Sequence, residues 1–168
     1  MSNTLTNPHG ESIVFRQTAA DTDGRLLEME ATWAPHRPAP PRHFHPCQTE
    51  TFEVVEGALR VWIHGHERDY GPGERFVVPS GTPHAMHAAG DRPARARWCV
   101  EPALGTERFF RAVWARSYHT APTPRRVLRL ATMLDAARAE YRLWGPPQWL
   151  QRVVLGVLAP LGRRFARA

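Results

Sequence analysis

The chain alternates apolar and polar residues in short runs between Ser12 and about Pro102. A period of two is typical of β-strands that bury one face, and glycine- and proline-containing turns separate these runs at regular intervals. The runs are SIVFRQ, RLLEMEATW, TFEVVEG, ALRVWIHG, ERFVVP, HAMHAA and ARARWCV. Because closing a sheet on itself removes its exposed edges, we predict a mainly β domain with a barrel or sandwich architecture.

After Pro102 the apolar period lengthens to that of an α-helix. Thr123 is suited to cap a helix that has Pro124 in its first turn, and a last helix follows the break at residues 145–147. Pro160 should kink this last helix. A further apolar stripe over residues 106–116 contains Phe109, Phe110, Val113 and Trp114. The sequence therefore predicts a strand-rich domain over residues 1–104 and a C-terminal extension of two or three helices over residues 105–168.

Charge divides along the same boundary. Residues 1–102 carry 10 Arg against 13 acidic residues, whereas residues 103–168 carry 12 Arg against 3. All 22 basic residues are arginine, in a chain rich in proline and glycine, so we interpret the basicity as a solvated face and expect no nucleic-acid partner.

Other sequence features limit the classes of protein that are possible. The opening residues MSNTLTNPHGES lack both a basic and an apolar leader segment, and no run approaches the roughly 20 apolar residues of a membrane span. Two cysteines, Cys47 and Cys99, are too few for a disulfide framework. We therefore expect a soluble, cytoplasmic protein.

Candidate chemistry gathers in the stretch HFHPCQTE, residues 43–50. On a strand His43 and His45 share a face, because the side-chain period is two, and Glu50 follows on the next run. His84, which begins a strand after a tight turn, can complete the set. Imidazole and carboxylate ligands together suit a divalent transition metal, namely Fe, Mn, Ni or Zn.

These two segments resemble the two motifs of the cupin superfamily. The pattern HxH(x)4E(x)6G is matched by His43, His45, Glu50 and Gly57, and G(x)5PxG(x)2H by Gly73, Pro79, Gly81 and His84. The resemblance covers residues 11–102 and implies a small jelly-roll β-barrel, a double-stranded β-helix, that holds a metal on three His and one Glu. It departs at Arg37, where the first motif usually begins with Gly, and at Ala88, where the second usually ends with Asn.

The strand phase also predicts the surroundings of the metal. Phe52, Val54, Met86 and Trp98 should face it, while Arg60, Arg95 and Arg97 take the opposite phase. An apolar pocket favours a small hydrophobic or aromatic substrate, although the same residues are equally consistent with the core of a narrow barrel. The leading hypothesis is a metal-dependent dioxygenase-type oxidoreductase in which Glu50 serves as catalytic base. A metal-dependent isomerase or cyclase, and a non-enzymatic small-molecule binder that acts through its tail, remain alternatives.

Several residues are expected outside the site. His87 should point away from the metal, and His64 and His66 should lie on the surface at a hairpin tip. The helical extension could pack on the barrel or swap across a dimer, cover the barrel mouth, or lie on an anionic membrane through its last helix. The cupin resemblance itself implies a homodimer.

Overall fold

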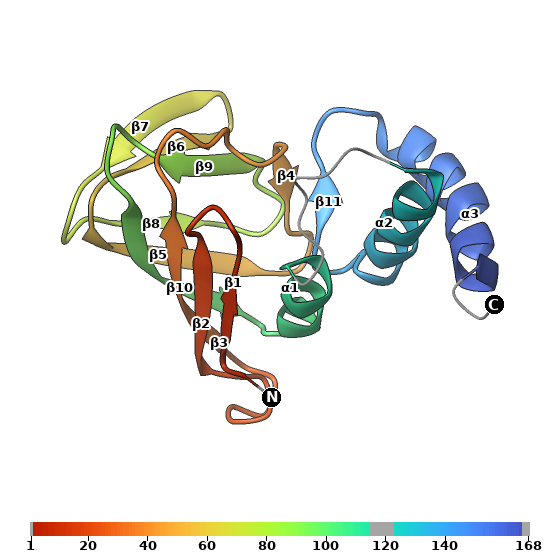
Figure 1. The fold of residues 1–168 in the computed structure, drawn as a ribbon, viewed down its shortest axis with the longest axis horizontal. Helices are drawn as coiled ribbons and strands as arrows, with labels where there is room; N and C mark the ends of the chain where they lie inside the picture. The colour runs from red at the N-terminus through yellow and green to blue at the C-terminus, as the bar shows by residue number, and fades with distance from the viewer. Residues whose placement is uncertain (1, 115–122, 166–168) are drawn as a thin grey trace.

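The computed structural model describes residues 2–114 and 123–165, and its body consists of two antiparallel β-sheets (Figure 1). The first sheet has the order β1 (Thr4–Thr6), β2 (Ser12–Gln17), β3 (Leu27–Trp33), β10 (Ala94–Glu101), β5 (Thr49–Glu56) and β8 (Arg75–Val78). The second has the order β11 (Arg142–Leu143), β4 (His43–Phe44), β9 (His84–Ala88), β6 (Leu59–Ile63) and β7 (His66–Tyr70). This mainly β architecture is compatible with the predicted jelly roll, without forming one closed barrel.

The hydrophobic core lies between the two sheets. Along β5 the even-numbered Glu50, Phe52 and Val54 are buried, whereas the odd-numbered residues between them are less so. Leu59 and Val61 of β6 contribute to the same core from the second sheet. The predicted period of two is therefore confirmed, and it directs both the apolar side chains and Glu50 inward.

Gly57 makes the turn between β5 and β6. Its φ of 67° lies in the left-handed region that favours glycine, and a Cβ at this position would lie 2.2 Å from the Pro93 carbonyl oxygen. Glycine is therefore required here for two independent reasons, backbone conformation and close approach of a neighbouring loop.

Three helices follow the last strand of the first sheet: α1 (Thr106–Trp114), α2 (Pro124–Ala136) and α3 (Gln148–Phe165). The Thr123 hydroxyl accepts a hydrogen bond from the Arg126 amide at 3.4 Å, so the predicted cap of α2 is confirmed. Residues 115 and 116, the end of the first predicted helix, lie outside the described residues. None of the described helices is long and apolar enough to cross a membrane.

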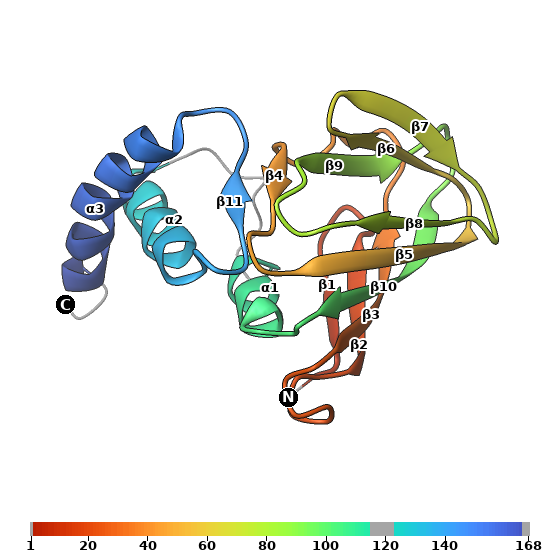
Figure 2. The same cartoon turned by 180° about the vertical axis from the view of Figure 1, so that it is seen from behind.

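Helices α2 and α3 pack against each other beyond the end of the sheets, as both views show (Figures 1 and 2). A Cβ at Gly162 would lie 2.4 Å from the Leu128 carbonyl oxygen, so glycine permits the close approach of the two helices. The Arg163 guanidinium pairs with the Asp135 carboxylate at 3.1 Å across the same interface. Helix α3 continues through Pro160.

Strands β1, β7 and β11 were not among the predicted runs. Strand β7 lies at a sheet edge, and its sequence HERDY is exposed at four of its five residues, so it has no apolar alternation to detect. Its Asp69 pairs with Arg60 on β6 at 2.7 Å. His64 in the turn and His66 at the start of β7 are both exposed, as expected.

Candidate metal centre

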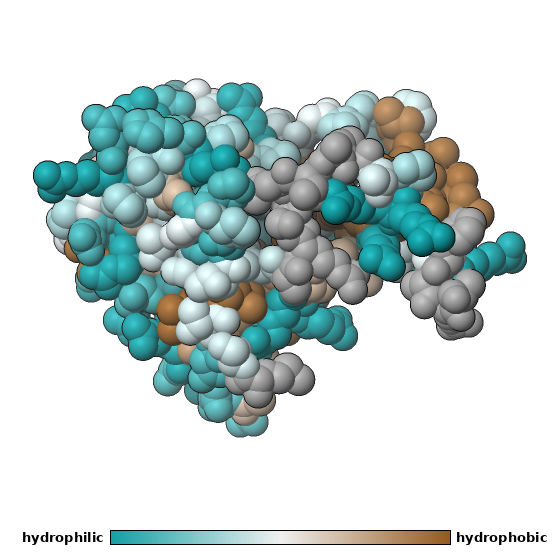
Figure 3. All heavy atoms as spheres, in the orientation of Figure 1, coloured by the Kyte–Doolittle hydropathy of each residue, from teal (hydrophilic) through white to brown (hydrophobic). Residues whose placement is uncertain are grey.

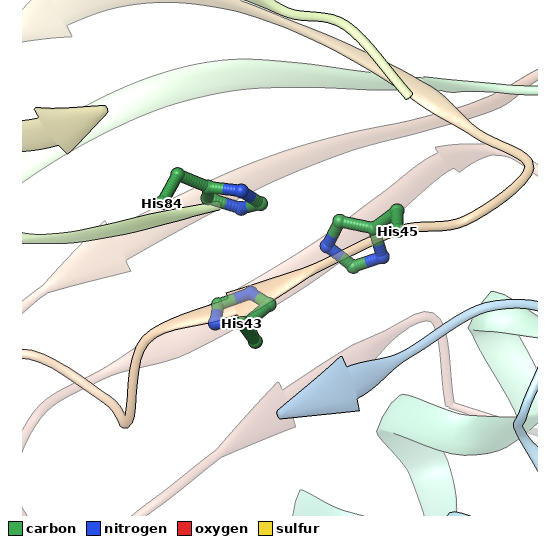
Figure 4. A group of neighbouring side chains, drawn as sticks. All are labelled: His43, His45 and His84. Carbon is green, nitrogen blue, oxygen red and sulfur yellow. The ribbon is translucent and has the colours of Figure 1, made fainter. Parts of the chain in front are cut away.

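Strand pairing brings three histidines together at one end of the sheets (Figure 4). His43 on β4 lies directly opposite His84 on β9, and His45 comes just after β4. One ring nitrogen from each lies within 4.8 Å of the others, and no other such group of three occurs among the described residues. The structure thus brings His84 beside His43 and His45, and their binding of a metal stays a prediction.

Glu50 reaches the same cluster from the opposite sheet. Its Oε1 lies 3.3 Å from His45 Nε2, and its Oε2 lies 2.9 Å from His84 Nε2. Two ligands bonded to one ion at about 2.1 Å, with an angle of about 90–110° between them, stand roughly 3.0–3.4 Å apart. The 3.3 Å separation from His45 lies within this range, and the 2.9 Å separation of the other carboxylate oxygen from His84 is that of a hydrogen bond.

The backbone orients all three imidazole rings. His43 Nδ1 lies 2.9 Å from the Pro41 carbonyl oxygen, and His84 Nδ1 lies 3.0 Å from that of Thr82. His45 Nδ1 contacts the carbonyl oxygen of Glu140, which is 95 residues away in the chain. When Nδ1–H donates to a carbonyl, the lone pair is left on Nε2, and Nε2 is then free to bind a metal.

The electrostatic environment favours the protonation states that a metal requires. Burial lowers the pKa of His43 to about 3, and burial also lowers the pKa of His45. Burial alone would raise the pKa of Glu50, but His45 and His84 outweigh it and lower that pKa to about 2. Neutral imidazoles at His43 and His45 and an ionised carboxylate at Glu50 are thus favoured at neutral pH.

His84 behaves differently from the other two histidines. Burial opposes its charged form, but the hydrogen bond and the charge of Glu50 outweigh burial and raise the pKa of His84. Glu50 therefore opposes the loss of a proton from His84. His45 Nε2 is buried and has no hydrogen-bond partner among the described residues, as expected for an atom that awaits a ligand.

The residues predicted to line a substrate pocket occupy two kinds of position. Phe52, Val54 and Met86 belong to the hydrophobic core, and their role in a pocket stays a prediction. Trp98 is half-buried, and its Nε1–H donates to Glu50 Oε1 at 3.1 Å. Trp98 therefore orients the carboxylate, a contact that strand phase did not reveal.

Other candidate residues lie outside the cluster. His87 shares a face of β9 with Ala85 and lines a separate surface depression with Arg42 and Trp62, so it points away as expected. Cys47 is an exposed free thiol and Cys99 a half-buried one. Ala88, which stands where the motif usually has Asn, packs in the core.

Sequence reasoning missed two residues of the C-terminal extension that lie against the histidines. The Tyr141 ring stacks on His43, with ring centroids 4.6 Å apart and an angle of 24° between the planes. The Glu140 carbonyl contacts His45, as described above. No local sequence motif indicates that either residue contacts the histidines, because each contact depends on pairing between segments about 95 residues apart.

The family model of the cupin domain matches residues 29–100. Residues 29–100 form a cupin domain. The match includes both histidine motifs and the strands that carry them, so the predicted family and fold are confirmed.

Comparison with curated proteins gives relatives of this cupin domain. The chain is 35% identical over 94 residues to a probable oxidoreductase, patJ, of Aspergillus clavatus. This alignment covers 53% of this chain and 29% of the relative. The chain is 32% identical over 65 residues to quercetin 2,3-dioxygenase of Bacillus subtilis, covering 39% of this chain and 19% of the relative. The chain thus covers less than a third of the length of either protein.

A similar fold occurs in a solved structure, the RmlC-like cupin from Shewanella frigidimarina. It superposes with a TM-score of 0.53 at 17% sequence identity, covering 64% of this chain and 89% of that one. The three C-terminal helices lie outside residues 29–100, which the cupin family model matches.

Proposed function

We propose that His43, His45, His84 and Glu50 bind one divalent transition metal, Fe, Mn, Ni or Zn. The observation that carries the proposal is the cluster of three ring nitrogens within 4.8 Å, each ring oriented by a backbone carbonyl. A bound metal would supply Lewis acidity and open positions for a small molecule.

We further propose that the protein is an oxidoreductase of the dioxygenase type that acts on a small hydrophobic or aromatic molecule. Two curated relatives named as an oxidoreductase and a dioxygenase support the reaction class. Glu50 is the candidate to accept or return a proton, since its buried carboxylate lies 2.9 Å from His84 Nε2 and accepts a hydrogen bond from the Trp98 N–H. The apolar side chains behind it would exclude water.

Two alternative functions differ from the dioxygenase in their need for oxygen and in turnover. A metal-dependent isomerase or cyclase would use the same Glu50 without oxygen, whereas a binding module would show no turnover. We also propose that the chain divides functionally at about residue 104, into the cupin domain and the helical extension, and that it forms a homodimer.

The test begins with metal analysis of protein purified without chelator and without a histidine tag. Metal-loaded protein is then mixed with catechols and flavonols in an oxygen electrode. Oxygen uptake that disappears in Glu50→Gln supports the dioxygenase, and anaerobic conversion of the substrate supports the isomerase. Absence of metal after reconstitution would refute the metal site itself.

A further inference from the structure

The segment between α2 and α3, residues 137–144, adds a strand to the sheet that carries the metal-site histidines. We call this segment the strap. Within it β11 pairs antiparallel with β4, with Leu143 opposite His43 and Arg142 opposite Phe44. The Trp144 amide extends the pairing by donating to the Arg42 carbonyl at 2.7 Å. In Figure 4 this blue strand passes beside His43.

Glu140 anchors the strap at its first contact with the site. Its backbone carbonyl contacts His45 Nδ1, and its side chain is only 8% exposed. Oε1 of that side chain accepts a hydrogen bond from the Gly105 amide at 3.0 Å, just before α1. The residue whose carbonyl orients His45 is therefore itself anchored to the segment just before α1.

Tyr141 is held between two aromatic rings. One is His43, described above, and the other is Phe109 of α1, whose centroid lies 5.2 Å away at an interplanar angle of 27°. Offset stacking of this kind favours one orientation of each ring. The plane of the His43 imidazole is thus restrained by the strap and by α1 together.

We propose that the strap orients the metal-site histidines, and that its residues Glu140 and Tyr141 are positioning residues that raise metal affinity. The inference rests on the proposed metal site and extends it to residues outside the matched cupin domain. Groups that orient metal ligands typically change affinity by about 10- to 100-fold when they are removed. The strap contributes two such groups, one for each of two histidines.

Metal affinity of full-length variants tests this proposal. Zn²⁺ is titrated against a chromophoric chelator, and Co²⁺ absorption reports the geometry of the ligands. Tyr141→Ala should weaken Zn²⁺ binding at least tenfold and alter the Co²⁺ spectrum, whereas Tyr141→Phe should stay within about threefold of the wild type. Glu140→Ala should weaken binding similarly, because the carbonyl loses its anchor.

Trp144→Ala is the matched control. This aromatic residue of the strap is 51% exposed and contacts Phe44, not a histidine. Circular dichroism establishes that every variant is folded. Equal affinities in all folded variants would overturn the role of the strap while leaving the metal site intact, and equal losses in Tyr141→Phe and Tyr141→Ala would overturn the stacking argument. Absence of Zn²⁺ binding in the wild type would instead refute the proposed function.

A second inference comes from the outer face of α3. Six apolar residues on this helix are at least 38% exposed: Trp149 66%, Leu150 38%, Val153 57%, Val154 43%, Val157 59% and Leu161 41%. Their spacing places them on one face, while Ala159 and Gly162 on the opposite face pack toward α2. Figure 3 shows the resulting hydrophobic patch over α3. Contiguous apolar surface of this kind marks an interaction site.

Charge identifies the partner. Residues 124–165 carry eight Arg and two acidic residues, and Arg152 and Arg164 are exposed on α3 itself. A second copy would bring another excess of arginine to the same interface, whereas anionic lipid head groups would neutralise it. We infer that α3 lies on an anionic membrane surface, with its apolar face in the lipid interface and Trp149 at the boundary.

Co-sedimentation with vesicles tests this inference. The protein should bind phosphatidylcholine vesicles that contain phosphatidylglycerol, with a blue shift of tryptophan fluorescence, and binding should fall in high salt. The double variant Val153→Asp, Val157→Asp should abolish binding. Val77→Asp, at an equally exposed valine of β8, should not. Equal binding to neutral vesicles, or a dimer lost in the double variant without vesicle binding, would overturn the inference.

Discussion

Acid sensitivity of the metal-free protein follows from the lowered pKa of His43, a partly buried residue. In the unfolded chain an imidazole takes up a proton near pH 6.5, but in the folded protein the pKa of His43 is lowered to about 3. Between these values the unfolded state binds one more proton than the folded state, so stability falls as pH falls. The limiting slope is about 1.4 kcal/mol per pH unit.

The variant His43→Gln isolates this contribution, because glutamine does not titrate. Between pH 6.5 and 4.5 the wild type should lose about 2 kcal/mol more stability than the variant. Glu50 adds little in this interval, because its pKa is near 4.5 in the unfolded chain and is lowered to about 2 in the folded protein. The difference between wild type and variant therefore reports mainly on His43.

Urea unfolding after treatment with EDTA measures the difference, with tryptophan fluorescence as the signal. The free energies of wild type and variant are plotted against pH, and the prediction concerns their divergence, not their absolute values. Parallel plots from pH 6.5 to 4.5 would refute the reasoning, because they would mean that His43 takes up its proton equally easily in the folded state.

Three further substitutions have definite expected outcomes. His84→Ala should remove most of the bound metal while His87→Ala retains it, as measured by metal analysis; equal contents would exclude the proposed ligand set. Gly57→Ala should destabilise the protein by at least about 3 kcal/mol in urea unfolding, through left-handed strain plus a steric clash, whereas Gly65→Ala, which meets no neighbouring atom, should cost about 1 kcal/mol. Trp98→Phe removes the N–H that holds the carboxylate ligand and should weaken Zn²⁺ binding about tenfold in a competition titration; unchanged affinity would show that this hydrogen bond is dispensable.

Strands with one buried face could be predicted from the sequence, whereas exposed strands could not. Strands such as β5 were predictable because one face is buried, so the apolar period appears in the sequence itself. Strand β7 is exposed and held by cross-strand ion pairs such as that of Arg60 with Asp69, and this pattern resembles a polar loop. Turn residues were equally readable, since the left-handed conformation at Gly57 restricts the residue type.

The candidate site was predictable to the same limited extent. His43, His45 and Glu50 lie within eight residues, and the turn before His84 marks a strand start, so spacing alone brought them together. The contacts of Glu140 and Tyr141 depend instead on the pairing of the two-residue strands β4 and β11. Such short strands have no periodicity, and the partner of each is decided by tertiary packing.

The proposed role of the strap makes the helical extension and the metal site energetically dependent on each other. If the contacts of Glu140 and Tyr141 raise metal affinity, linkage requires that bound metal stabilise the strap by the same factor. The strap connects α2 to α3, and α3 carries the exposed apolar face. An event at that face that displaces the strap would therefore lower metal affinity, and loss of metal would loosen the connection between the two helices. On this proposal the extension would couple events at the exposed face of α3 to the metal site of the cupin domain.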